Sequence, residues 1–148
     1  MKQAELILSL RKISRIINLD SKRIQKLCGL SIPQLLSLQY LERQEDYQST
    51  QLDLRKHLEL NSSTVTGIVS RLISKGLMAK LPAKGDKRAT WLCLTAAGLK
   101  ATENAPLLFQ NKLISKLNQI PNHKSEAIEK GLKELAELLE EFPAELEA

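Results

Sequence analysis

The sequence predicts a mainly α-helical protein with one small β-hairpin. Apolar residues recur at helical spacing along most of the chain, in segments bounded by capping residues and glycines. Two short runs in which apolar residues alternate, 77–81 and 90–94, enclose a tip that contains Pro82 and Gly85, which is typical of a hairpin. The predicted order is a long helix, three shorter helices, the hairpin and two more helices. Three helices followed by a hairpin (the wing) describe a winged helix-turn-helix.

A long first helix is expected over residues 4–27. Gly29 ends it, Ser31 is placed to cap the second helix, and the first turn of that helix tolerates Pro33. The apolar residues of the first helix form a narrow seam that is interrupted at Asp20: Leu6, Leu10, Ile13, Ile17, Ile24 and Leu27.

The fourth helix has the clearest amphipathic pattern. The short third helix before it has Ser49 or Thr50 as its cap and contributes Leu54 and Leu58 to the core. In the fourth helix, a polar cap precedes a buried apolar stripe, and a glycine suited to a left-handed backbone follows the last turn. The cap is Asn61 or Ser62, the stripe is Val65, Ile68, Val69, Leu72 and Ile73, and the glycine is Gly76.

Two helices are expected after the hairpin. Thr95 is placed to cap a fifth helix over residues 96–118, and the segment "IPNH" ends it. The last helix has an apolar seam of five residues: Ile128, Leu132, Leu135, Leu139 and Phe142. We interpret the chain as one domain over residues 1–148, with a winged helix-turn-helix core at 31–98 flanked by helices at 4–28 and 96–142.

The composition is that of a soluble globular protein with a basic excess. The chain has 43% hydrophobic and 26% charged residues, and 22 Lys+Arg against 17 Asp+Glu give a net charge of +5. No signal-like start or membrane span is visible, so a cytoplasmic protein with reduced thiols is expected. The charges are segregated: basic residues dominate 71–88, whereas glutamates dominate 126–148. One end of the molecule should therefore attract phosphate.

The polar start of the fourth helix suits a DNA groove. In a helix-turn-helix the second helix enters the major groove, where small hydroxyl side chains allow close approach and both donate and accept hydrogen bonds. Gly67 is informative because glycine costs a helix roughly 1 kcal/mol relative to alanine. The predicted DNA-binding residues of this helix are Ser62, Ser63, Thr64, Thr66, Gly67, Ser70 and Arg71. A generous capping region is the alternative interpretation.

The basic hairpin tip is expected to reach the minor groove. Arg88 is the candidate for insertion, with Lys84 and Lys87 on phosphates. Asp86 would repel DNA unless it orients a neighbouring arginine, so we predict a salt bridge from Asp86 to Arg88 or Arg71.

These residues resemble the winged-helix core of the MarR family of bacterial transcription regulators. The matching points are Ser63–Thr66, Lys75–Leu77, the wing pair Asp86-x-Arg88 and the stretch Leu92–Gly98. The resemblance covers residues 29–98. It implies a ligand-responsive homodimer that binds double-stranded DNA at a pseudo-palindromic operator, usually as a repressor, and a small-molecule effector of unknown identity. The dimer interface would use the seams of the first and last helices: Leu6, Leu10, Ile13, Ile17, Ile128, Leu132, Leu135, Leu139 and Phe142.

Two positions depart from the family pattern. Where many members have alanine in the third helix, this chain has Arg55, so packing there is looser or Arg55 points to solvent. Where glycine often separates the third and fourth helices, this chain has Glu59, which is strained if the turn needs a positive φ.

Other functions have weaker support. Cys28 is a candidate for thiol-based redox sensing, whereas Cys93 is interpreted as structural. No cofactor is expected. His57 and His123 are far apart, no Cys/His pair has metal-ligand spacing, and no catalytic pair is visible. The remaining alternative is a winged helix that binds only proteins, and the basic wing tip argues against it.

Overall fold

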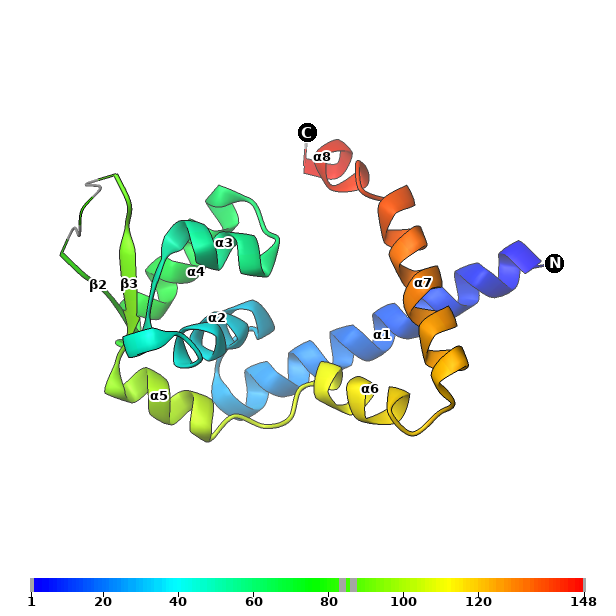
Figure 1. Cartoon of the computed structure of the whole chain (residues 1–148), viewed down its shortest axis with the longest axis horizontal. Coiled ribbons are helices and arrows are strands. Elements are labelled where there is room, and N and C mark those ends of the chain that lie inside the picture. The colour runs from blue at the N-terminus through cyan, green and yellow to red at the C-terminus, as the bar shows by residue number, and fades with distance from the viewer. Residues whose placement is uncertain (1, 83–84, 86–87, 148) are drawn as a thin grey trace. The chain divides into compact units, whose positions relative to one another are not determined.

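The structure is a computed structural model that describes residues 2–82, 85 and 88–147. The chain forms two compact units, Met1–Pro106 and Leu107–Ala148. The first contains α1 (Lys2–Cys28), α2 (Ile32–Glu42), the short 3₁₀ helix η1 (Glu45–Tyr47), β1 (Gln48–Thr50), α3 (Gln51–Leu58), α4 (Ser62–Ser74), β2 (Met78–Lys80), β3 (Trp91–Leu94) and α5 (Ala96–Glu103) (Figure 1). The second contains α6 (Phe109–Leu117), α7 (Asn122–Leu138) and α8 (Phe142–Glu147). The mainly helical fold with a small antiparallel sheet is the fold class that the sequence predicts.

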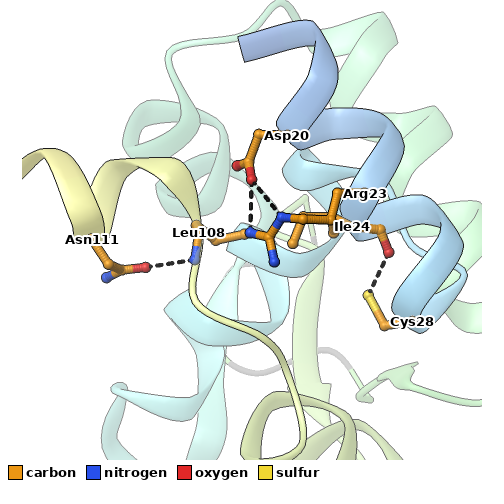
Figure 2. A network of polar contacts seen from close by, with 6 residues as sticks. All are labelled: Asp20, Arg23, Ile24, Cys28, Leu108 and Asn111. Atoms are coloured by element: carbon orange, nitrogen blue, oxygen red, sulfur yellow. Dashed lines mark hydrogen bonds and ion pairs between the residues drawn. The ribbon is translucent and has the colours of Figure 1, made fainter. Parts of the chain in front are cut away.

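Helix α1 runs without interruption through the break in its apolar seam. Asp20 is buried, and its carboxylate accepts two hydrogen bonds from the Arg23 guanidinium, the shorter 2.7 Å long (Figure 2). A buried carboxylate is costly unless it is paired, so Arg23 makes the polar position in the seam tolerable. The helix ends at Cys28, and Gly29, which was predicted to end it, follows with φ +70°.

The junction between α1 and α2 is tied to α4 by a single side chain. Lys75, the capping residue that follows α4, donates a hydrogen bond from Nζ to the carbonyl oxygen of Gly29 at 2.7 Å. These two residues are 46 positions apart in the sequence.

The structure shows which residue caps each helix for which the sequence offered two candidates. Ser31 caps α2 in a reciprocal capping box with Gln34, whose backbone N–H donates to Ser31 Oγ at 3.2 Å. Thr50, not Ser49, caps α3. Asn61, not Ser62, caps α4 by accepting from the Thr64 N–H at 2.8 Å.

The sheet has three strands in the order β1-β3-β2, and both pairings are antiparallel. In β1, Ser49 pairs with Leu92, while Met78 of β2 pairs with Leu94. The hairpin of β2 and β3 was predicted, but β1 was not. A three-residue segment of polar residues has no alternating apolar pattern, and β1 is a strand because β3 supplies its hydrogen bonds.

The core of the first unit lies among its helices and the inner face of the sheet. Gly76 takes φ +75° after α4, as predicted, while Ile73 of the predicted stripe is only half-buried. The buried apolar residues of this unit are Ile24, Leu30, Leu35, Leu38, Leu41, Leu54, Val65, Ile68, Val69, Leu72, Met78, Leu92 and Leu94.

Two predicted helix boundaries are wrong. The helix expected over 96–118 is divided into α5 and α6, because Pro106 lacks an N–H donor and disfavours a helical backbone at Ala105. The last predicted helix ends at Leu138, and Phe142 begins α8. Pro143 explains this break, since a proline ring in a continuous helix clashes with the carbonyl four residues earlier, here that of Leu139.

Glu59 is the strained turn residue that the sequence anticipated. It follows α3 with φ +54°, in the left-handed region that favours glycine. Glu59→Gly is therefore expected to raise the free energy of unfolding by about 0.5–1 kcal/mol, measured by chemical denaturation at one fixed protein concentration. Glu59→Ala is the control because it keeps the strain. An equal gain from both variants would show that the glutamate side chain, not the backbone, is unfavourable.

Candidate nucleic-acid interface

The predicted DNA-binding residues of α4 lie on one broad exposed face. The buried residues Val65, Ile68, Val69 and Leu72 turn the opposite side of the helix into the core. Ser62, Ser63, Thr64, Thr66, Ser70 and Arg71 are exposed, and Gly67 is half-buried among them. The face combines small hydroxyl groups with one arginine, so it can meet a nucleic-acid surface closely and form hydrogen bonds to it.

Gly67 is not required by the packing of this chain. A Cβ atom built at this position has no neighbouring atom within 4 Å. Gly67→Ala is therefore expected to raise stability by up to about 1 kcal/mol through helix propensity. If α4 enters a groove, the added methyl group meets the DNA and lowers affinity severalfold. Parallel denaturation and DNA-binding titrations measure the two effects, and unchanged DNA affinity would place Gly67 outside the contact surface.

A hollow beside α4 is lined by residues of the wing and of two helices. Its volume is about 400 Å³, and it is lined from α3, from the start of α4 and from the segment that precedes β3: Thr50, Gln51, Leu52, Arg55, Ser62, Val65, Arg88, Ala89 and Thr90. Arg88 is exposed, and it lines the same hollow as Ser62. The sequence placed these two residues in separate contact regions, and the fold makes those regions neighbours.

Arg55 is a site residue that the sequence did not identify. It is half-buried and lines this hollow together with Arg88. The sequence presented Arg55 only as a departure from the family pattern, with looser packing or solvent exposure as the expected result. Two guanidinium groups on one concave surface are suited to phosphate oxygens.

A second hollow, of about 370 Å³, lies on α4 further along the helix. It is lined by Gln51, Thr66, Val69, Ser70, Ile73, Ser74 and Lys80. Lys80, the last residue of β2, adds a positive charge beside the hydroxyl face of α4. Gln51 lines both hollows and was also missed, because nothing in its local sequence indicates that the start of α3 reaches α4.

Three of the predicted wing residues lie outside the part of the chain that the structure describes. Lys84, Asp86 and Lys87 lie outside the described residues, so the predicted contacts of the two lysines with phosphate and the salt bridge from Asp86 to Arg88 or Arg71 stay predictions.

The cysteines form no disulfide, and among the described residues the cysteines and histidines form no metal site. Cys28 and Cys93 are free thiols and both are half-buried; Cys28 Sγ donates to the Ile24 carbonyl oxygen at 3.1 Å (Figure 2). His57 stacks on Tyr40 with ring centroids 4.5 Å apart. Across the described residues, no group of three or more His, Cys, Asp or Glu side chains is arranged to hold a metal ion. In the same part of the chain, no helix has the length and apolar character needed to cross a membrane.

Each unit exposes an apolar helix face. In the first unit, Leu6, Ile13 and Ile17 of α1 are 51%, 46% and 44% exposed, and Leu10 is half-buried. In the second unit, most of the predicted seam residues are exposed and Leu135 is half-buried. Four of them expose between 41% and 57% of their surface: Ile128, Leu132, Leu139 and Phe142. Exposed apolar stripes of this extent usually mark an interaction surface.

The order of helices, the three-stranded sheet and the polar face of α4 define a winged helix-turn-helix protein. Residues 30–90 match the model of the MarR family. The match covers the winged-helix segment and agrees with the resemblance that the sequence analysis found there. None of the curated proteins compared with the sequence matches it. The family match supports a DNA-binding transcriptional regulator as the class of protein.

Solved structures of MarR-type regulators have the same fold. S. aureus MepR in complex with DNA is 22% identical, with a TM-score of 0.74 over 89% of this chain and 96% of that one. Sco3205 of Streptomyces coelicolor, a MarR family transcriptional regulator in complex with DNA, is 15% identical, with a TM-score of 0.73 over 93% and 86%. PcaV of Streptomyces coelicolor, a transcriptional regulator in complex with its natural ligand, is 21% identical, with a TM-score of 0.67 over 88% and 89%.

Proposed function

We propose that the protein is a homodimeric, ligand-responsive repressor that binds a pseudo-palindromic DNA operator in the cytoplasm. The observation that carries this proposal is the surface formed by α4 and the base of the wing. It joins the exposed hydroxyl face of α4 to Arg55, Arg88 and Lys80 around two hollows. The major groove admits a helix with such a face, and the guanidinium and ammonium groups complement the phosphates on either side.

The related structures support the partners in this proposal. MepR and Sco3205 were solved with DNA, and PcaV with its natural ligand. Repression is the usual activity that the family resemblance implies.

Binding to DNA fragments from upstream of the protein's own gene tests the function. At two salt concentrations, we expect a saturable complex whose log affinity falls with log salt by about 0.9 per neutralised phosphate. Protection of two half-sites ~10 base pairs apart would fit two winged heads on successive major grooves. No preference over unrelated DNA at low salt would favour the alternative, a winged helix that binds proteins.

The proposed dimer interface consists of the apolar faces of α1 and α7. Exposure of these faces to water is unfavourable, and a second copy of the chain would cover them. Leu132→Lys, which places a charge in the α7 seam, is expected to raise the dimer dissociation constant at least about tenfold, measured by sedimentation equilibrium. Glu137→Gln is the control, because residue 137 lies about 140° around the helix from residue 132, outside the seam, and the substitution also raises the net charge by one. A monomeric wild-type protein, or equal effects of both variants, would contradict this interface.

A further inference from the structure

The hydroxyl group of Thr66 has a fixed hydrogen-bond polarity. Its proton is committed, because Thr66 Oγ1 donates to the carbonyl oxygen of Ser62 at 2.9 Å. The same oxygen accepts a hydrogen bond from Gln51 Nε2 at 3.2 Å. Gln51 is itself held in place, since its backbone N–H donates to the Thr90 carbonyl oxygen at 2.8 Å, next to β3. Thr66 is exposed and lies on the face of α4 proposed to meet DNA.

A hydroxyl group has one proton to donate and two lone pairs that accept. In Thr66 the proton and one lone pair are used within the protein. One lone pair remains for a partner outside. Toward DNA, Thr66 is therefore an acceptor only, unlike a freely rotating hydroxyl, which adapts to either kind of partner.

The major groove distinguishes bases by this polarity. Adenine N6 and cytosine N4 are amino groups that donate, whereas guanine O6 and thymine O4 are carbonyl oxygens that accept. We infer that Thr66 is a specificity-determining residue that selects an amino base, adenine or cytosine, over a keto base, guanine or thymine, at one position of each operator half-site. This inference rests on the proposed DNA-binding function.

The side chain also offers a second way to read a base. The methyl group of a threonine can contact the C5-methyl group of thymine, which is a keto base. This contact would produce the opposite preference. Two variants separate the possibilities, because Thr66→Val keeps the shape and a methyl group but loses the oxygen, whereas Thr66→Ser keeps the oxygen and loses the methyl group.

The experiment selects binding sites for the full-length protein from a pool of randomised DNA duplexes. Wild-type, Thr66→Val and Thr66→Ser proteins are compared, with circular dichroism to verify their helical content. We expect the wild-type half-site to contain one position at which amino bases are preferred over keto bases by about fivefold, the effect of one hydrogen bond. Thr66→Ser should retain that preference and Thr66→Val should lose it, while the preferences at the other positions stay unchanged.

Other outcomes overturn the inference. If Thr66→Val keeps the amino preference, or if the wild-type site has no position of this kind, the Thr66 oxygen does not read a base. If Thr66→Ser loses the amino preference, the acceptor oxygen does not set it. If the wild type selects thymine at this position, the methyl group is the reading element. A wild-type protein that enriches no sequence and has no salt-sensitive DNA affinity would overturn the proposed function and this inference together.

Discussion

Arg88→Ala is expected to weaken operator binding by about tenfold or more while leaving the dimer intact. Arg88 is exposed on the hollow that it shares with Arg55 and Ser62, at the point where the wing joins the reading face of α4. An arginine at a groove or phosphate contributes about 1–3 kcal/mol to a protein–DNA complex. The measurement is a DNA-binding titration at several salt concentrations, where losing one cation from a phosphate lowers the salt slope by about 0.9.

The control for Arg88 is Arg43→Ala, which removes the same charge from the exposed capping residue that follows α2. A general effect of net charge would weaken DNA binding equally in both variants. A contact made by Arg88 would weaken it only in the first. Undiminished operator affinity in Arg88→Ala would remove the wing from the proposed mechanism, while the roles of α4 would remain to be tested by the variants at Gly67 and Thr66.

Gly98→Ala is expected to lower the free energy of unfolding by about 2 kcal/mol or more. Gly98 is buried near the start of α5, and a Cβ atom there would collide with the backbone carbonyl oxygen of Leu77 and lie 2.7 Å from Leu94 Cδ1. The Leu77 carbonyl cannot move freely, because it accepts a hydrogen bond from the Thr95 N–H. Chemical denaturation at a fixed protein concentration measures the change.

Gly67→Ala is the matched control for Gly98→Ala, since the same methyl group is added to a helical glycine that has open space around it. The two variants should change stability in opposite directions. A Gly98→Ala protein as stable as the wild type would mean that α5 moves away from β2 and β3 at little cost.

The sequence predicted those parts of the fold whose signals are local. Helix caps, the end of the first helix at Gly29, the positive φ at Gly76, and the hairpin all depend on a few neighbouring residues. The errors came from two sources. Pro106 and Pro143 were local signals that the apolar periodicity masked. Strand β1 had no local signal, because its three polar residues become a strand only when β3 lies beside them.

In the candidate site, too, the sequence predicted only the features that depend on residues close together in the chain. The hydroxyl face of α4 and the basic wing follow from residues adjacent in sequence. Arg55 and Gln51 could not be assigned to the site, because the hollows that they line are assembled from α3, α4 and the strands. The hydrogen-bond polarity of Thr66 depends on Gln51, which is 15 positions away. Such a property exists only in the folded chain.

The hydrogen bond from Lys75 to Gly29 connects the joint between α1 and α2 to the end of α4. Gly29, Leu30 and Ser31 alone join α1 to α2, and Lys75 ties this short joint to the end of α4. A rotation of α1 about the joint can therefore reach the end of α4 through this contact, to the extent that the flexible lysine stem does not absorb it. Because the contact is exposed and one hydrogen bond contributes about 1 kcal/mol, the joint transmits small displacements to α4 and breaks under larger ones.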